Sequence, residues 1–323
     1  MPSVFSPGLA PTGQSFSIMK NLIVLLGPTG VGKSELCLQL ADSLQTPVIN
    51  ADSRQIFAEI PIGTAAPTAV QQARAKHYFV GNHHLDDYYS ASMFEQDVLA
   101  LLQRLFDGSE DGTAHEVCLM AGGSMMYIDA VCNGIDDIPT VDPTTRETMK
   151  RRLEEEGLSA LVDELHRLDP EHWQTVDRCN PRRVVHALEI CHMTGKTYTS
   201  FRTNSKKQRP FRIIKIGLNR PREEMYERIN TRVLQMVDNG LVEEARALFP
   251  RRGLNSLNTV GYKELFAYFD QRIPLSEAIR QIQSNTRCYM RKQLTWFKKD
   301  PDITWFSPEN IEDILNFIRQ KTV

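Results

Sequence analysis

The segment from Gly27 to Ser34 has the residue types and the spacing of a phosphate-binding loop. It reads GPTGVGKS and satisfies the pattern G-x-x-x-x-G-K-[ST]. In such a loop the backbone N–H groups and the N-terminus of the following helix surround an anion, while Lys33 adds a positive charge and the Ser34 hydroxyl can bind Mg²⁺. We therefore predict a di- or triphosphate site, the P-loop, formed by Gly27, Pro28, Thr29, Gly30, Val31, Gly32, Lys33 and Ser34.

The P-loop does not say which phosphate compound binds. Alone it favours ATP, as in a P-loop kinase that acts on a small metabolite. The sequence, however, contains neither the N-K-x-D signature of guanine recognition nor an apolar run that ends in the Asp-Glu pair of a typical ATPase. A diphosphate ester presents much the same oxygens as a nucleotide, so both kinds of ligand stay open.

Asp52 follows the second predicted strand, residues 47–50, and should emerge at the same sheet edge as the P-loop. A carboxylate there can act as a general base or bind Mg²⁺ through water. It can equally cap a helix N-terminus, because aspartate and serine both cap well. From the residues alone, the two interpretations carry about equal weight.

Two segments are strongly basic, although the chain has a formal net charge of −2. From Arg178 to Lys215, ten Lys or Arg residues stand against one acid, Glu189, and the basic residues from Arg287 to Lys299 are interleaved with aromatic residues and no acid. Phosphate backbones attract such segments, and RNA bases stack on aromatic rings. A solvated helix face explains either segment about equally well. Two such segments in a slightly acidic chain nevertheless favour a polyanionic partner.

A parallel sheet is needed to position these groups. Apolar runs at 21–26 and 117–121 predict buried strands that end at glycines, and each is followed by a predicted helix, at 33–44 and 124–131. The other predicted elements are strands at 211–218 and 303–306 and helices at 221–239 and 276–299. We expect an α/β fold, a P-loop NTPase-like parallel sheet flanked by helices.

The chain is predicted to divide into three parts. Residues 139–203 have charged, helical patterns and no convincing strand, which predicts a helical insertion domain. The catalytic core then comprises residues 20–138 and 204–323. Residues 1–19 carry no charge and are rich in Ser, Pro and Gly, so we expect a disordered tail and not a secretory signal.

The cysteines and the hydropathy pattern bear on the compartment. The six cysteines include no C-x-x-C pair, so we expect free thiols in a reducing cytoplasm. No apolar run approaches the roughly 20 residues that cross a bilayer. We expect a cytoplasmic protein that is a monomer and has no membrane partner.

The ordered motifs between about residues 21 and 306 resemble those of the tRNA dimethylallyltransferase (tRNA isopentenyltransferase) family. They are GPTGVGKS at 27–34, ADSRQIF at 51–57, IGTAAPT at 62–68, HHLDDYYSASMFEQD at 83–97, AGGSMMYIDAV at 121–131, NPRRVVHALEICHMTGKT at 180–197, NTVGYKEL at 258–265 and RKQLTWFKK at 291–299. Each motif alone is moderately specific, whereas the ordered set is highly specific.

The resemblance implies transfer of a dimethylallyl group from dimethylallyl diphosphate to N6 of the adenosine at position 37, beside the anticodon, in tRNAs that read codons beginning with U. The P-loop would then hold the diphosphate leaving group, with Lys33 and a Mg²⁺ ion at Ser34. Asp52 would be the general base, and Ser124 would contact the reacting amine or base. An arginine of the segment 228–232 would bind diphosphate; we favour Arg232 over Arg228, without deciding between them.

The same resemblance implies contacts with the tRNA anticodon stem-loop. The residues concerned are Asp52, Ser53, Arg54, Gln55, Ser124, Arg146, Arg182, Arg183, Val184, Val185, His186, Asn258, Thr259, Val260, Gly261, Tyr262, Lys263, Arg291, Lys292, Gln293, Thr295, Trp296 and Lys298. Two of the motifs depart from the family pattern: Ser124 replaces a common threonine, and Ala66 replaces a common lysine. Neither departure removes a proposed catalytic group.

Two other functions are consistent with parts of the sequence. A P-loop kinase of a small metabolite would use the same lysine and Mg²⁺ site on ATP. A non-catalytic RNA-binding protein would keep the basic segments beside a P-loop that has lost its activity.

Overall fold

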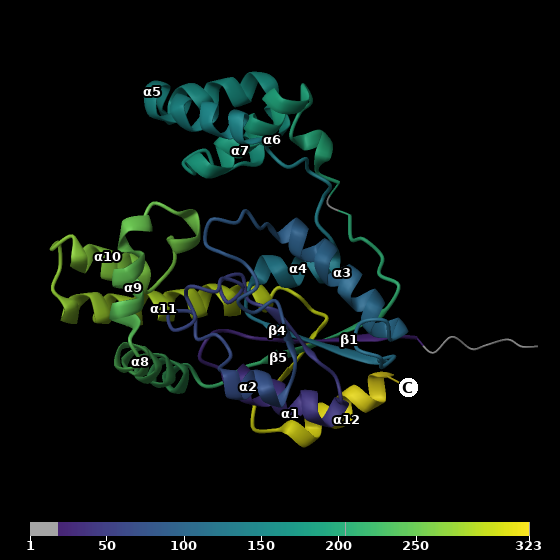
Figure 1. Cartoon of the computed structure of the whole chain (residues 1–323). Coiled ribbons are helices and arrows are strands. Elements are labelled where there is room, and N and C mark those ends of the chain that lie inside the picture. The colour runs from purple at the N-terminus through teal and green to yellow at the C-terminus, as the bar shows by residue number, and fades with distance from the viewer. Residues whose placement is uncertain (1–18, 204, 323) are drawn as a thin grey trace, which may run out of the picture. The chain divides into compact units, whose positions relative to one another are not determined.

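The computed structural model describes residues 19–203 and 205–322, which form parts of two compact units (Figure 1). The first unit joins the chain up to Cys132 to the chain from Arg209 onward, and the second is Asn133–Gln208. The second unit is therefore a few residues longer at each end than the predicted insertion, 139–203. Apart from Met19, the tail predicted for residues 1–19 lies outside the described residues.

The first unit is built on a six-stranded sheet in which every neighbouring pair is parallel. Its strands are β1 (Asn21–Leu26), β2 (Val48–Ala51), β3 (His77–Tyr78), β4 (Val117–Gly122), β5 (Arg212–Leu218) and β6 (Ile303–Phe306), in the spatial order β3-β2-β4-β1-β5-β6. The predicted fold class is confirmed.

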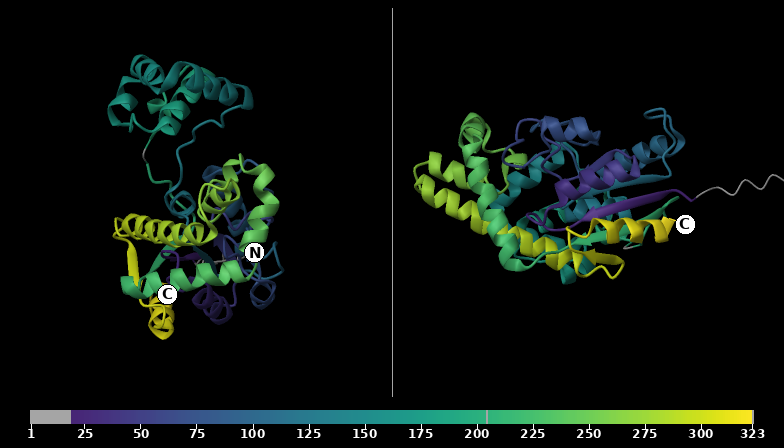
Figure 2. Two further views of the ribbon diagram at one scale, coloured as in Figure 1. Left: turned by 90° about the vertical axis from the view of Figure 1, so that its left-hand side faces the viewer. Right: turned by 90° about the horizontal axis from the view of Figure 1, so that it is seen from below.

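Helices cover both faces of this sheet and extend beyond its end (Figures 1 and 2). They are α1 (Lys33–Leu44), α2 (Ala69–Arg74), α3 (Ala91–Asp107), α4 (Met125–Asn133), α8 (Arg222–Asp238), α9 (Leu241–Leu248), α10 (Tyr262–Phe269), α11 (Leu275–Phe297) and α12 (Ile311–Thr322), with 3₁₀ turns at Phe249–Arg251 and Asn255–Leu257. None of the described helices is long and apolar enough to cross a membrane.

Alternate residues of β1 belong to different cores, because successive side chains of a strand point to opposite faces. Leu22 and Val24 pack in the core that α3 and α4 cover. Ile23 and Leu25 pack in the core that α1, α8 and α12 cover. Both faces are thus buried, which accounts for the unbroken apolar run that predicted this strand.

The second unit is helical (Figure 1). Its buried residues form a small core of their own. It contains α5 (Pro143–Leu168), α6 (Pro170–Thr175), α7 (Pro181–Thr194) and a 3₁₀ turn at Thr199–Phe201. Side chains of Asp142 and Asn180 cap the first turns of α5 and α7 by accepting backbone N–H groups. Gly157 interrupts α5, since its φ of 79° is not helical.

Candidate active site

Three chain segments leave the sheet side by side at the carboxyl ends of β1, β2 and β4. Leu26, the last residue of β1, pairs with Gly122 of β4, and Gly122 also pairs with Ala51 of β2. The P-loop, Asp52 and Ser124 follow directly after these strands. The rule that groups at the ends of parallel strands converge therefore holds for the predicted catalytic groups.

Glycines allow the backbone of the P-loop to turn, and the Lys33 side chain bonds back to the start of the loop. Gly30 and Gly32 have φ values of 84° and 103°, a region that favours glycine. The Lys33 Nζ donates hydrogen bonds to the carbonyl oxygens of Gly27 at 2.7 Å and Pro28 at 2.9 Å. The ammonium group is therefore held across the mouth of the loop.

Lys33 lies in a strongly desolvated position. Burial lowers the pKa of its ammonium group to about 7, and the nearby Arg232 cation acts in the same direction, whereas Asp52 opposes the shift. An anion close to a lysine stabilises the charged form. A diphosphate bound in the loop would therefore restore the positive charge of Lys33.

Two arginines donate hydrogen bonds to carbonyl groups of the P-loop. Arg220, which precedes α8, donates from Nε to the Val31 carbonyl oxygen at 2.7 Å. Arg228, within α8, donates from Nε to the Gly30 carbonyl oxygen at 3.0 Å. Arg228 is exposed, so it touches the loop from the solvent side.

Arg232 lies one turn further along α8 and reaches the loop from inside. One of its terminal nitrogens donates to Thr29 Oγ1 at 2.5 Å. Its Nε is buried and has no hydrogen-bond partner among the described residues. Burial also lowers the pKa of the guanidinium group, and Asp52 opposes this shift. A buried donor without a partner is costly, and an anionic ligand would satisfy it.

The Asp52 carboxylate organises the turn that follows β2. Its Oδ1 accepts the backbone N–H groups of Arg54 at 2.9 Å and Gln55 at 3.3 Å. No helix begins there, so the group closes a turn and does not cap a helix. Its Oδ2 has no hydrogen-bond partner within the described part of the chain. One oxygen thus holds the backbone, and the other is available to accept a proton.

Ser124 fixes the residues on either side of Asp52. Its N–H donates to the Ala51 carbonyl oxygen at 3.2 Å, and its Oγ accepts the N–H of Ser53 at 2.8 Å. The Ser124 hydroxyl also donates to Ser53 Oγ at 3.2 Å. Because Ser124 is only 6% exposed, these contacts are largely shielded from water.

Tyr289 on α11 joins this cluster, a placement that the sequence did not predict. The residue is 38% exposed, and its hydroxyl lies near Ser124 and the Asp52 carboxylate. Burial raises the pKa of this hydroxyl to about 12, and the neighbouring Asp52 carboxylate acts in the same direction. The hydroxyl therefore stays protonated at neutral pH. It lies next to Asp52 and Ser124, the two residues predicted to act on the target adenosine.

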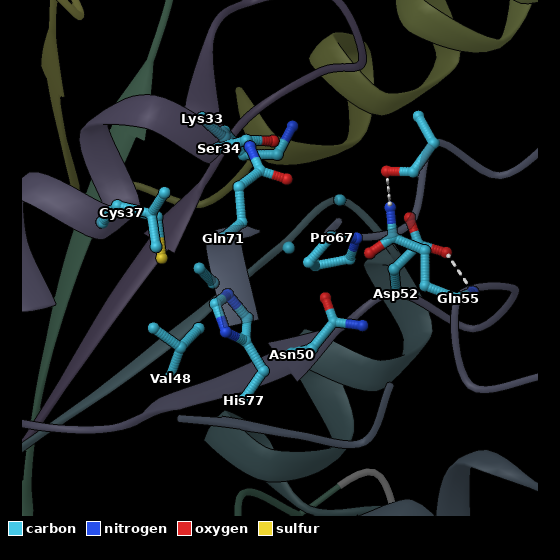
Figure 3. Close-up of a pocket in the computed structure, with 15 residues that line it drawn as sticks. Lys33, Ser34, Cys37, Val48, Asn50, Asp52, Gln55, Pro67, Gln71 and His77 are labelled. Atoms are coloured by element: carbon cyan, nitrogen blue, oxygen red, sulfur yellow. Dashed lines mark hydrogen bonds between the residues drawn. The ribbon is translucent and has the colours of Figure 1, made fainter. Parts of the chain in front are cut away.

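A cavity of about 80 Å³ leads from the P-loop to the Asp52 turn (Figure 3). Lys33 and Ser34 line it from α1, and Asp52 and Gln55 line it from the segment after β2. Among the described residues, no three His, Cys, Asp or Glu side chains converge on one point. A dedicated metal cage is therefore absent from that part of the chain, but hydroxyl and carboxylate oxygens face the cavity.

Gln293 lies inside the core, although a tRNA contact was predicted for it. It is 2% exposed, and its Oε1 accepts the Thr29 N–H at 2.9 Å while its Nε2 donates to the Gly123 carbonyl oxygen at 2.7 Å. A side-chain contact with tRNA is therefore not expected for this residue. Arg291, Lys292, Thr295 and Trp296 are exposed on the same helix, and Lys298 is exposed directly after it.

Tyr262 and Val184 are also buried, against the prediction that they contact tRNA. Both are 0% exposed. The Tyr262 hydroxyl donates to Glu244 Oε1 at 2.5 Å, and the same carboxylate accepts the N–H groups of Ile62 and Gly63, each at 2.9 Å. Tyr262 thus supports the loop after Gln55, and Val184 belongs to the core of the second unit. A side-chain contact with tRNA is therefore not expected for either residue.

Replacement of Gly63 by alanine tests the buried position of Tyr262. A Cβ at Gly63 would lie 2.4 Å from the Tyr262 hydroxyl oxygen, so we expect the free energy of unfolding to fall by about 1–3 kcal/mol. Denaturant titration measures this change. Gly253→Ala is the control, because a Cβ at Gly253 meets no atom within 4 Å. Equal stability of the two variants would mean that Tyr262 points elsewhere.

Except for Gly261, the remaining predicted tRNA contacts occupy accessible or half-buried positions in their own units. In the first unit Ser53, Arg54 and Gln55 form the Asp52 turn, and residues 258–260 are half-buried before the exposed Lys263. In the second unit Arg182 and Arg183 are exposed at the start of α7, and Val185 and His186 are half-buried. Arg146 is exposed on α5. Gly261 is buried at the start of α10.

Known proteins resemble this chain over most of its length. A family model described as IPP transferase matches residues 55–300. The tRNA dimethylallyltransferase 1 of Bacteroides thetaiotaomicron is 58% identical over 301 residues, which cover 93% of this chain and 96% of the relative. That of Phocaeicola vulgatus is 59% identical over 297 residues, covering 92% of this chain and 97% of the relative.

Solved structures resemble it as well. The full-length tRNA isopentenylpyrophosphate transferase from Bacillus halodurans is 31% identical, with a TM-score of 0.68 and coverage of 94% of this chain and 97% of that one. A eukaryotic dimethylallyltransferase acting on tRNA is 23% identical, with a TM-score of 0.74 and coverage of 91% of this chain and 75% of that one. The second likeness bears on the fold alone.

Proposed function

The chain belongs to the IPP transferase family, and we propose that it transfers a dimethylallyl group from dimethylallyl diphosphate to N6 of an adenosine in tRNA. The observation that carries the proposal is the convergence of the P-loop, Asp52 and Ser124 at three adjacent strand ends. It combines an anion clamp with a free carboxylate oxygen. We further propose that the target is the adenosine at position 37, beside the anticodon, in tRNAs that read codons beginning with U.

The reaction forms a bond between the adenine N6 and the allylic carbon of the donor, while the bond from that carbon to the diphosphate oxygen breaks. Asp52 Oδ2 takes the proton that N6 loses. Negative charge grows on the leaving diphosphate, and positive groups placed there in advance stabilise the transition state. Lys33, Arg232 and the P-loop N–H groups have this role, while Ser124 and Tyr289 position the base.

A Mg²⁺ ion fits the oxygen atoms that face the cavity. Mg²⁺ prefers oxygen ligands and keeps several waters, so one hydroxyl and one carboxylate beside a diphosphate suffice. The Ser34 hydroxyl lines the cavity together with Asp52. Ser34 would hold the ion directly and Asp52 through water, and the bound ion would supply further neutralisation of the diphosphate charge.

A transfer assay tests the proposed function against its alternatives. The protein is incubated with unmodified tRNA, Mg²⁺ and dimethylallyl diphosphate labelled in the allyl group, and we expect label on N6 of adenosine. A kinase would prefer ATP to dimethylallyl diphosphate in calorimetric titration; the family does not favour this reading. Binding of tRNA without label transfer would identify a protein that only binds RNA and would overturn the proposal.

We propose that exposed basic side chains of α11 contact the tRNA backbone. Lys292→Ala should weaken tRNA binding and reduce the slope of log K against log salt concentration by about one unit, because one phosphate contact is lost. Filter binding over a range of salt concentrations measures the slope. Lys321→Ala, which removes an exposed lysine from α12, is the control. An unchanged slope for Lys292→Ala would assign this lysine to a solvated face.

The proposed function also implies a cellular compartment. Substrate tRNA is cytoplasmic in bacteria, and all six cysteines of the chain are free thiols. We therefore place the reaction in the cytoplasm.

Residues Arg182, Arg183 and His186 of α7, with Arg146 of α5, would contribute contacts with the anticodon stem-loop from the second unit.

A further inference from the structure

Gln293 is the one residue of the RKQLTWFKK motif whose side chain reaches the P-loop by a hydrogen bond that the structure describes. We propose that it is a positioning residue that couples tRNA binding on α11 to diphosphate binding in the P-loop. The proposal rests on the proposed function, because it needs both ligands to bind.

The contacts of Gln293 join two of the three strand-end segments of the active site. Its Oε1 holds the Thr29 N–H, and its Nε2 holds the Gly123 carbonyl oxygen. Thr29 in turn accepts the hydrogen bond of Arg232 through its side chain. The Gln293 amide therefore fixes Thr29, and Thr29 in turn holds the Arg232 guanidinium.

The space around this amide suits glutamine specifically. A Cβ at Gly123 would lie 2.6 Å from the Gln293 Nε2 and 3.6 Å from the Lys33 Nζ, so only glycine permits this close approach. One end of the side chain must accept and the other must donate. A carboxylate of the same length lacks the donor, and a thioether has no donor and only a weak acceptor.

The turns of α11 that contain Gln293 have one buried side and one exposed side. Gln293 and Phe297 are each only 2% exposed, whereas Arg291, Lys292 and Thr295 are exposed. An RNA phosphate bound by Lys292 would thus act on the residue next to Gln293. If one ligand restricts the motion of these turns, the second ligand loses less conformational entropy when it binds. The two ligands would then bind with positive coupling.

Coupling between two ligands is reciprocal and is measured as a ratio of dissociation constants. The test uses inorganic pyrophosphate with Mg²⁺ as the probe of the P-loop and an unmodified anticodon stem-loop RNA as the probe of α11. Calorimetry gives the Kd of pyrophosphate with and without saturating RNA. For the unaltered protein we expect RNA to lower this Kd by about fivefold or more.

Gln293→Met keeps the length of the side chain and removes both hydrogen bonds. We expect both probes to bind this variant but the ratio of Kd values to fall to about one. Gln281→Met is the matched control, since Gln281 lies on the same helix and bonds only to Glu277 among its described contacts. If Gln293→Met does not fold, Gln293→Glu replaces it: this variant keeps an acceptor for the Thr29 N–H but loses the donor to the Gly123 carbonyl oxygen, so the link between the two segments is broken and the ratio should also fall.

The outcomes separate the coupling from the proposed function. An unchanged ratio in a folded Gln293 variant overturns the coupling role, because a merely structural side chain would alter stability without altering the ratio. A ratio of one in the unaltered protein, with both probes bound, also overturns it and leaves the proposed function intact. Failure of the unaltered protein to bind either probe overturns both.

Discussion

Asp52→Asn should lower the rate of dimethylallyl transfer by about 10²- to 10⁴-fold, the usual contribution of a general base. The substitution keeps Oδ1, so the N–H groups of Arg54 and Gln55 retain their acceptor. It replaces Oδ2 by an amide nitrogen, which cannot take the N6 proton. Single-turnover transfer at saturating tRNA measures the rate, and filter binding should give an unchanged tRNA affinity.

Asp52→Ala is the companion variant that separates the two roles of this residue. It removes the turn contacts together with the base, so we expect loss of transfer and a lower free energy of unfolding. If Asp52 only closes the turn, Asp52→Asn will transfer at the rate of the unaltered protein while Asp52→Ala fails. That result would contradict the general-base assignment.

Arg232→Met should reduce kcat/KM for the donor by about 10²- to 10³-fold, as expected when a preorganised donor to developing negative charge is lost. The Arg232 guanidinium is desolvated and has a buried Nε without a partner in the described structure. A charge in such a place interacts with an anion much more strongly than an exposed one does. Steady-state kinetics and the inhibition constant of pyrophosphate measure the effect.

Arg228→Met is the matched control for this prediction. Arg228 lies one helical turn earlier on α8 and also contacts the P-loop, but it is exposed to solvent. Exposed charge contacts contribute little, so we expect a much smaller loss. The opposite ranking of the two variants would assign the diphosphate contact to Arg228.

Local sequence patterns predicted the elements that carry the reacting groups. The apolar run at 21–26 and the glycine-rich segment after it were sufficient for β1 and the P-loop, and the end of the second strand placed Asp52. β1 and β6 match the predicted ranges, β4 and β5 differ from them by one residue at one end, and β2, at Val48–Ala51, is shifted by one residue at both ends. These features depend on residues close together in the chain.

The residues that hold the P-loop in place could not be predicted from local patterns. Gln293 and Arg232 reach Thr29 across sequence separations of 264 and 203 residues. A motif marks such residues as important but does not say which face of a helix they occupy. Gln293 and Tyr262 were therefore assigned to tRNA, whereas burial places both inside the first unit.

The sequence contains a local signal for α3. Ser90 accepts the N–H of Met93 and begins the helix as an N-cap. Phe94, Val98 and Leu105 follow at helical spacing and are all 0% exposed. The two-residue strand β3, by contrast, is too short to produce a periodic pattern.

The order of strands in the sheet has a consequence for biosynthesis. β1 lies between β4 and β5, but β5 begins at Arg212, after the whole second unit has been translated. A nascent chain that has reached Cys132 therefore has one unpaired edge of β1 and a P-loop without Arg232 or Gln293. Domains generally fold as units during synthesis, and open strand edges invite mispairing. The complete P-loop site can therefore form only after α11 has been synthesised, because Arg232 and Gln293 both bond to Thr29.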